Sequence, residues 1–181
     1  MAKIAIAGAQ SSTIDLINAL ISNLYLIDFI INPGPEKQHM ISDYQDLEKL
    51  AEDIDATFIR PKTYTMNDSE SIALFDNVEI DILIVVGWQR LIPPWLLKKI
   101  SIGAFGMHGS SEHLPRGRGR SPMNWSIIEG KSLFITNLFK YDEGIDSGEI
   151  VDSQHFEINL WDDIASLQHK NTISQVKLLI K

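Results

Sequence analysis

One segment of the chain, residues 106–125 (GMHGSSEHLPRGRGRSPMNW), gathers residue types that can do chemistry. It holds His108, a second histidine, and Arg116, Arg118 and Arg120 at alternate positions between glycines. An imidazole transfers protons near neutral pH, and planar guanidinium groups bind phosphate oxygens in pairs. The segment therefore predicts a histidine beside an anion held by arginines, with a solvated basic loop as the alternative.

Two other kinds of site fit this segment less well. His108, Glu112 and His113 are metal-ligand types, but their loop spacing implies no fixed geometry, so we expect no metal. Ser110 and Ser111 lie near His108 without the G-x-S-x-G elbow that exposes a nucleophilic serine. The anion-binding interpretation is therefore preferred.

The composition limits the class of protein. The chain has 181 residues, 44% hydrophobic and 22% charged, which is typical of one globular domain. A net charge of −8 argues against a broad nucleic-acid interface, and the absence of cysteine excludes disulfides and thiol nucleophiles. The start, MAKIAIAGAQ, is unlike a signal peptide, and no apolar run reaches the ~18 residues of a membrane span. We expect a cytoplasmic protein with no nucleic-acid or membrane partner.

Apolar runs alternate with helical patterns along the chain. Strands are predicted at 3–9, 26–32, 56–61, 79–87, 102–108, 132–141 and from the 142–151 segment to about residue 158. Helices are predicted after N-caps at Ser12, Ser42 and Ser121, at 92–100, and as one or two helices over 160–180. This order predicts an α/β fold, an open, mostly parallel twisted sheet with helices on both faces.

Two chemically notable segments come at predicted strand ends. In open α/β sheets, ligands bind just beyond the carboxyl ends of the strands. His108 follows the fifth predicted strand, and residues 87–90 (GWQR) follow the fourth. Asp146 lies in the turn I-D-S-G between the last two strands. It is either a turn residue or a carboxylate that orients and charges His108, and spacing alone does not decide.

From the fourth strand to residue 151 the chain resembles the formyltransferases that use 10-formyltetrahydrofolate. In that family a strand ends in N-x-H, followed by S-L-L-P, R-G-x-x-P and a helix near I-N-W. A later segment reads D-E-G-x-D-x-G-x-I. This chain has MH at 107–108, LPRGRGRSPMNW at 114–125 and DEGIDSGEIV at 142–151. The resemblance implies a Rossmann-like core and one catalytic domain over 1–181, with no separate C-terminal domain.

The resemblance also implies roles for individual residues. His108 and Asp146 fall on the catalytic histidine and aspartate, which would stabilise an oxyanion or relay a proton during formyl transfer to an amine. The 10-formyltetrahydrofolate co-substrate would lie against Trp88, Gln89, Arg90, Leu91, Ile92, Tyr141, Asp142, Gly144 and Ile145. The phosphorylated acceptor would bind at Ser110, Arg116, Arg118, Arg120 and Asn124.

The chain departs from the family pattern in two places. Gly106 replaces the family asparagine, and losing that amide donor would cost about 2.7–4 kcal/mol of transition-state stabilisation unless another donor replaces it. We expect Ser110 or Asn124 to replace it; the alternative is a non-catalytic relative. The second departure is GSSEHL after His108, which is two residues longer than the family segment.

The acceptor remains open between several amines. The G-R-S-P pattern resembles formyltransferases that act on nucleotide-linked amino sugars for surface polysaccharides, and this acceptor is ranked first. Glycinamide ribonucleotide is second. Methionyl-tRNA is third, because the chain is acidic and we expect no tRNA-binding domain after residue 181. A folate- or nucleotide-binding module without turnover is the alternative class. The sugar, the nucleotide and the oligomeric state are not predicted.

Overall fold

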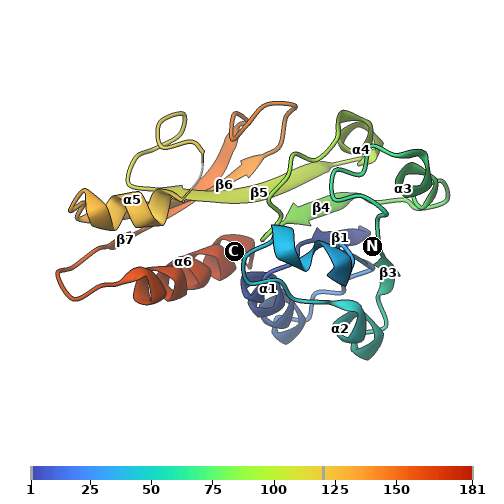
Figure 1. Ribbon diagram of the computed structural model, residues 1–181, viewed down its shortest axis with the longest axis horizontal. Helices are drawn as coiled ribbons and strands as arrows, with labels where there is room; N and C mark the ends of the chain where they lie inside the picture. The colour runs from blue at the N-terminus through green and yellow to red at the C-terminus, as the bar shows by residue number, and fades with distance from the viewer. Residues whose placement is uncertain (1, 120, 181) are drawn as a thin grey trace. The chain divides into compact units, whose positions relative to one another are not determined.

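The computed structural model describes residues 2–119 and 121–180 and is drawn in Figure 1. The chain divides into two compact units, unit 1 (Met1–Phe105) and unit 2 (Gly106–Lys181). The strand order is β3-β2-β1-β4-β5-β6-β7. The sheet is thus open, seven-stranded and mostly parallel, which confirms the predicted α/β class. The single catalytic domain over 1–181 stays a prediction.

Unit 1 is built on short parallel strands. β1 (Ile4–Ala7) pairs with both β2 (Phe29–Ile31) and β4 (Ile82–Val85), and β2 pairs with β3 (Thr57–Ile59). Ile6 aligns with a β2 and a β4 isoleucine and is fully buried. Continuous apolar strands of this kind are typical of a parallel sheet that is buried on both faces.

The first helix begins two residues earlier than the sequence suggested. Ser12 was expected as the N-cap, and this is wrong, because α1 (Ser11–Ser22) follows Gln10, which forms a capping box with Thr13. Asp43 accepts hydrogen bonds from the Ser11 backbone N–H at 3.0 Å and from its hydroxyl. This carboxylate satisfies the first turn, so Ser12 is free to pack inward as a buried residue.

The second predicted helix begins later than expected. Ser42 does not cap it, since α2 (Glu48–Asp53) begins after Leu47. The Gln45 backbone N–H donates to the Ala9 carbonyl at 2.8 Å, which holds this segment in an irregular path. The other helical elements of unit 1 are η1 (Pro35–Met40), α3 (Ser69–Ala73) and α4 (Pro94–Lys99), of which only α4 was predicted.

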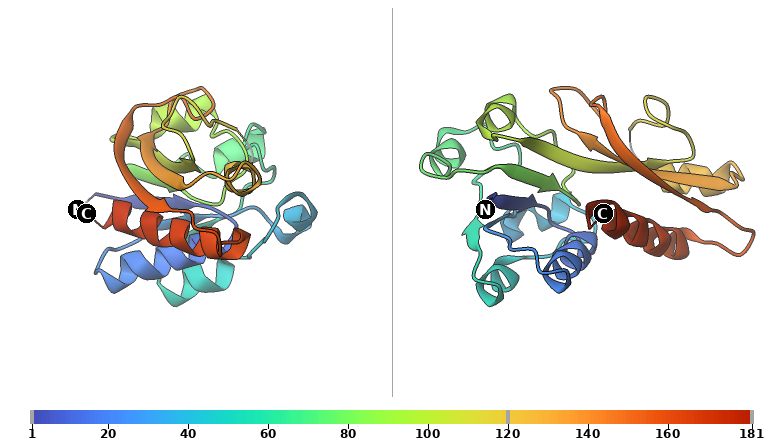
Figure 2. Two further views of the ribbon diagram at one scale, coloured as in Figure 1. Left: turned by 90° about the vertical axis from the view of Figure 1, so that its left-hand side faces the viewer. Right: turned by 180° about the vertical axis from the view of Figure 1, so that it is seen from behind.

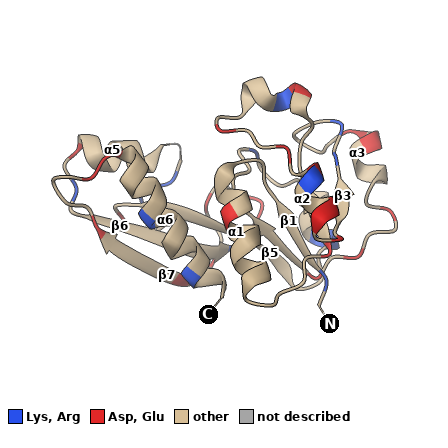
Figure 3. Cartoon of the chain, turned by 90° about the horizontal axis from the view of Figure 1, so that it is seen from below, with Lys and Arg blue, Asp and Glu red and all other residues tan. Residues whose placement is uncertain are grey.

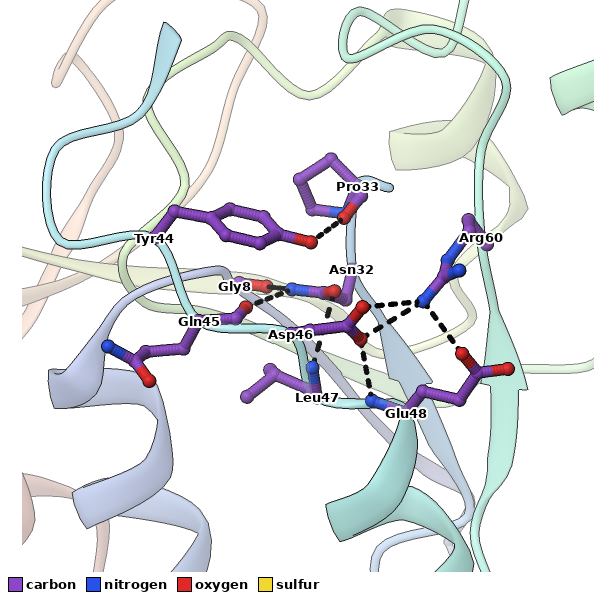
Figure 4. A network of polar contacts seen from close by, with 9 residues as sticks. All are labelled: Gly8, Asn32, Pro33, Tyr44, Gln45, Asp46, Leu47, Glu48 and Arg60. Carbon is purple, nitrogen blue, oxygen red and sulfur yellow. Dashed lines mark hydrogen bonds and ion pairs between the residues drawn. The ribbon is translucent and has the colours of Figure 1, made fainter. Parts of the chain in front are cut away.

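A buried asparagine fastens this irregular path to the strand ends, as Figure 4 shows. The Asn32 amide donates to the carbonyls of Gly8 at 2.9 Å and Gln45 at 3.1 Å. Its oxygen accepts from the Leu47 backbone N–H at 3.4 Å. Asn32 is 0% exposed, so these backbone groups have no solvent to replace it.

Unit 2 contains an antiparallel ribbon with a helix beside it. β6 (Leu133–Lys140) and β7 (Ile150–Glu157) pair antiparallel, with a register shift between Leu138 and Phe139. β5 (Gly103–Ser110) is the strand next to β6. α6 (Ile164–Leu179) lies along β6 and β7 in both views of Figure 2.

The closing segment forms one helix rather than two. Asp163 caps α6 by accepting from the Ser166 backbone N–H at 2.8 Å. The sequence of α6 contains Lys170 and Lys177 and no Asp or Glu, and in Figure 3 this helix accordingly carries blue but no red. Lys170 pairs with Asp162 at 2.6 Å, which fixes the loop before the helix to its second turn.

The Asn32 network generates a stability prediction. Asn32→Ala removes three hydrogen bonds from buried backbone groups, and each unsatisfied group costs about 1–3 kcal/mol. We expect the free energy of unfolding to fall by at least about 2 kcal/mol, measured by urea denaturation. Asn18→Ala is the matched control, because Asn18 is exposed on α1. Equal effects at both positions would contradict the role of the network.

Candidate active site

His108 and Asp146 come together in unit 2 from two different segments. His108 lies near the end of β5, and Asp146 lies in the loop between β6 and β7. His108 Nδ1 and Asp146 Oδ2 are 3.6 Å apart, and the two side chains are 11% and 21% exposed. This distance is an ion-pair distance and is longer than a hydrogen bond. The structure therefore brings together the two residues that the sequence proposed as a pair.

The other nitrogen of the imidazole faces a backbone carbonyl. His108 Nε2 lies 2.7 Å from the Gly117 oxygen. A carbonyl oxygen only accepts, so Nε2 carries a proton in this arrangement. A second proton on Nδ1 would then face the Asp146 carboxylate. The Gly117 carbonyl therefore occupies the hydrogen-bonding position of Nε2 in this structure.

The turn that carries Asp146 is organised by another carboxylate. Asp142 Oδ1 accepts from the Gly144 backbone N–H at 2.9 Å and from the Ser147 hydroxyl at 2.5 Å. These hydrogen bonds, the serine hydroxyl first, lower the pKa of Asp142 below its ordinary value. Gly148 closes the turn against the Lys140 carbonyl, where a Cβ would not fit. Asp142 thus organises the turn in which Asp146 stands.

The loop that follows β5 and carries Arg116 and Arg118, here called the arginine loop, also binds the turn that contains Asp146. Arg118 Nε donates to the Asp146 carbonyl at 3.0 Å, and the Gly119 backbone N–H donates to Asp146 Oδ2 at 3.3 Å. Arg116 is exposed, and its side chain makes no hydrogen bond or ion pair within the described residues. Arg120, which the sequence also assigned to the acceptor, lies outside the described residues. Among the described residues, the Arg118 side chain therefore has a partner and the Arg116 side chain has none.

A pocket of about 310 Å³ lies beside this loop. Its lining residues come from the ends of β5 and α5 (Pro122–Ile128) and the loops around them: Ser110, Ser111, Glu112, Gly117, Arg118, Pro122, Trp125, Glu129 and Lys131. Two of the predicted acceptor residues, Ser110 and Arg118, belong to it, and Asn124 is exposed elsewhere on α5. The sequence did not single out Lys131, which pairs with Glu129 at 3.3 Å in the lining of this pocket.

The hydroxyls of Ser110 and Ser121 do not make the hydrogen bonds that the sequence suggested. The Ser110 hydroxyl donates to the Glu112 carbonyl and accepts from the Glu112 backbone N–H at 3.1 Å, so its proton is directed into the loop. Ser121 stands at the N-cap of α5, but its backbone is left-handed and its hydroxyl makes no capping bond. The expected capping hydrogen bond is therefore absent, while Pro122 opens the helix as predicted.

Gly106 has no room for a side chain. A Cβ built on Gly106 would lie 2.2 Å from Tyr141 Cε1 and 2.5 Å from the Tyr141 hydroxyl oxygen. Real Cβ atoms do not approach other atoms so closely. The space of the family asparagine is therefore filled by the ring of Tyr141, which no sequence pattern connected with Gly106.

The predicted folate loop of unit 1 follows β4. Trp88 is 9% exposed and packs edge-on against Tyr64 at 4.8 Å, while its Nε1 is buried without a partner among the described residues. The Gln89 backbone N–H donates to the Tyr64 hydroxyl at 2.7 Å. Arg90 lies over the Tyr64 ring, Leu91 is 57% exposed and Ile92 is buried. A buried donor without a partner is compatible with a polar ligand at this loop.

In unit 2, the four residues predicted to contact folate span the turn described above. Tyr141 is partly buried, whereas Asp142, Gly144 and Ile145 are exposed.

The described residues contain no cluster of three or more His, Asp or Glu side chains placed to hold a metal. Within the same residues, no helix combines the length and apolar character needed to cross a membrane.

The sequence of this chain is similar to those of known formyltransferases. A family model described as formyl transferase matches residues 32–181. A methionyl-tRNA formyltransferase from Rickettsia bellii (strain RML369-C) is 26% identical over 181 residues, covering 99% of this chain and 58% of that protein. The chain thus spans less than two thirds of the length of that relative.

Solved structures share the fold. A phosphoribosylglycinamide formyltransferase from Bacillus halodurans has a TM-score of 0.79 and 18% identity, covering 98% of this chain and 91% of that one. A sugar 3N-formyl transferase, solved with dTDP and 5-N-formyl-THF, has a TM-score of 0.69 and 20% identity. It covers 98% of this chain and 60% of that one.

The backbone of Asp146 generates a second stability prediction. Its φ of 46° is left-handed, a conformation that asparagine tolerates and that costs alanine about 1 kcal/mol. We expect Asp146→Ala to be about 1 kcal/mol less stable than Asp146→Asn in urea unfolding. At Asp15, which is exposed in α1, the alanine variant should be at least as stable as the asparagine variant. The same ranking at both positions would contradict the left-handed assignment.

Proposed function

This chain belongs to the formyl transferase family, and from that premise we propose that it transfers a formyl group from 10-formyltetrahydrofolate to the amine of a small phosphorylated acceptor. The observation that carries the proposal is the pairing of His108 Nδ1 with Asp146 Oδ2 at 3.6 Å. An imidazole held by a carboxylate is suited to proton transfer and to stabilising developing negative charge. The arginine loop beside the pair supplies cations for a phosphate.

The proposed reaction forms one bond and breaks one bond at the formyl carbon. The acceptor amine attacks that carbon, and its carbonyl electrons move to the oxygen, which becomes an oxyanion. Collapse restores the carbonyl, breaks the bond to the folate nitrogen, and leaves a formylated amine and tetrahydrofolate. The proton lost by the amine replaces the formyl group on the folate nitrogen. His108 relays this proton or stabilises the oxyanion, and Asp146 orients the ring.

The donor in this proposal is a co-substrate and supplies the formyl carbon. The residues proposed to hold it in unit 1 are Trp88 to Ile92, where Trp88 Nε1 is buried without a partner among the described residues. In unit 2 the proposed residues are Tyr141, Asp142, Gly144 and Ile145. Asp142 contributes by shaping its turn, since its carboxylate is bonded within the turn.

For the acceptor, we place a nucleotide-linked amino sugar first. The G-R-S-P pattern supports this choice, and a sugar 3N-formyl transferase of the same fold was solved with a nucleoside diphosphate. Glycinamide ribonucleotide stays second and methionyl-tRNA third, as amines of proteins that this chain resembles. We place the reaction in the cytoplasm. The chain has no cysteine and so needs no oxidising compartment to form disulfides.

A mass-spectrometric screen tests the proposal. The protein is incubated with 10-formyltetrahydrofolate and a panel of nucleotide-linked amino sugars, with glycinamide ribonucleotide and methionyl-tRNA as separate arms. A mass gain of one formyl group on a sugar nucleotide supports the proposed acceptor. A gain on one of the other arms alone reassigns it, and no gain on any arm leaves two interpretations, an amine outside the panel or a non-catalytic binding module.

The catalytic pair generates a kinetic prediction. His108→Ala and Asp146→Asn should each lower kcat/KM by about 10²–10⁴-fold, because general acid–base catalysis of this kind is lost. The circular dichroism and the unfolding midpoint should stay close to those of the native chain. Either variant retaining near-native kcat/KM would contradict the assigned roles.

Arg116 and Arg118, the described arginines of the arginine loop, generate a paired prediction. Arg116→Ala should raise the KM for a phosphorylated acceptor while kcat stays within about threefold, because Arg116 has no structural partner in the described residues. Arg118→Ala should lower kcat as well, since it also releases the Asp146 carbonyl. Steady-state kinetics with acceptor and folate varied in turn distinguish the two. An equal rise of KM for both substrates in Arg116→Ala would contradict phosphate binding.

A further inference from the structure

The tyrosine that fills the space above Gly106 stands beside the catalytic histidine. In a strand, residues two apart point to the same face. Gly106 and His108 are two apart in β5, so their side-chain positions share a face. The Tyr141 hydroxyl oxygen lies 2.5 Å from the Cβ position of Gly106. The phenol therefore sits over the face of β5 that carries the imidazole.

Local structure fixes the direction of this ring. Tyr141 follows the last residue of β6, Lys140, and its ring packs on Phe139 with centroids 5.1 Å apart. The β6–β7 register shifts between Leu138 and Phe139, just before this point. The extra residue of this shift, Val151, lies on β7, so β6 continues without an inserted residue to Lys140, directly before Tyr141. The position of the Tyr141 ring is therefore set by the end of β6 and by packing on Phe139.

The hydroxyl of Tyr141 is available as a donor. Among residues 2–119 and 121–180 it has no hydrogen-bond partner, although neighbouring loop groups are paired. Burial, and then the nearby Asp146 carboxylate, raise the pKa of Tyr141 above the ordinary value for tyrosine. The phenol thus keeps its proton at neutral pH, and a protonated phenol donates to an oxyanion.

We propose that Tyr141 is a catalytic residue of this chain, whose hydroxyl donates a hydrogen bond to the oxyanion formed during formyl transfer. It supplies the donor that Gly106 lacks, and Gly106 is glycine because the phenol needs that space. The inference rests on the proposed function. It differs from the sequence expectation, which placed the replacement donor on Ser110 or Asn124.

Tyr141→Phe tests the inference, because it removes one oxygen and keeps the ring. The probe is 10-formyltetrahydrofolate with the acceptor that is formylated in the screen, or with water if the chain releases tetrahydrofolate without an acceptor. We expect kcat to fall about 10²–10³-fold, as for loss of one oxyanion donor, while the KM for the folate changes less than threefold. Tyr25→Phe, the same change at a 41% exposed tyrosine, should leave kcat unchanged.

Each outcome of this comparison is decisive. A large loss of kcat in Tyr141→Phe alone, with an unchanged unfolding midpoint, supports the inference. Native-like kcat in Tyr141→Phe, while the native chain turns over, overturns the inference and leaves the proposed function standing. If the native chain neither formylates an acceptor nor releases tetrahydrofolate, the proposed function fails and the role of Tyr141 fails with it.

A rescue experiment separates chemistry from packing. Gly106→Asn alone should be inactive or unstable, because the new side chain overlaps the Tyr141 ring. Tyr141→Ala removes both the donor and the obstacle. The double variant Gly106→Asn/Tyr141→Ala should recover at least tenfold of the kcat lost in Tyr141→Ala. No recovery in a folded double variant would contradict the exchange of one donor for the other.

Discussion

The pairing of His108 with Asp146 is the interaction on which the rest of the site depends. Neither residue is placed by its neighbours in sequence alone. β5 brings the imidazole to a strand end, and the β6–β7 ribbon returns the carboxylate to within 3.6 Å of it. The turn is then held by Asp142 from within and by Arg118 and the Gly119 N–H from the arginine loop. The loop that carries Arg116 and Arg118 thus also positions the Asp146 carboxylate.

Close packing sets a second constraint on this site. The Tyr141 ring excludes any side chain at position 106, so an asparagine and this tyrosine cannot occupy the same space. The sequence lacks the family asparagine at position 106, and in the structure the Tyr141 hydroxyl lies at that position. The Gly117 carbonyl accepts a hydrogen bond from His108 Nε2 at 2.7 Å, so the arginine loop also contacts the imidazole. Within unit 2, the His108–Asp146 pair, the Tyr141 ring over Gly106 and the arginine loop are therefore in mutual contact or share neighbours.

Much of the fold could be predicted from local patterns, since buried apolar runs such as 79–87 have few alternatives to a strand. The helix starts at Ser12 and Ser42 could not, because Asp43 and Asn32 decide them from distant positions. His108 and Asp146 could be named from motif resemblance, whereas their separation required the folded ribbon. The partnership of Gly106 with Tyr141 links residues 35 positions apart and follows only from packing.

The stoichiometry of turnover tests the central claim most directly. The native chain is incubated with 10-formyltetrahydrofolate and the panel of amines, and tetrahydrofolate and formylated product are both quantified. Formyl transfer at this site predicts one tetrahydrofolate for each formylated amine. Tetrahydrofolate without any formylated amine would mean hydrolysis in place of transfer, and neither product would mean that the His108–Asp146 pair does not catalyse this chemistry.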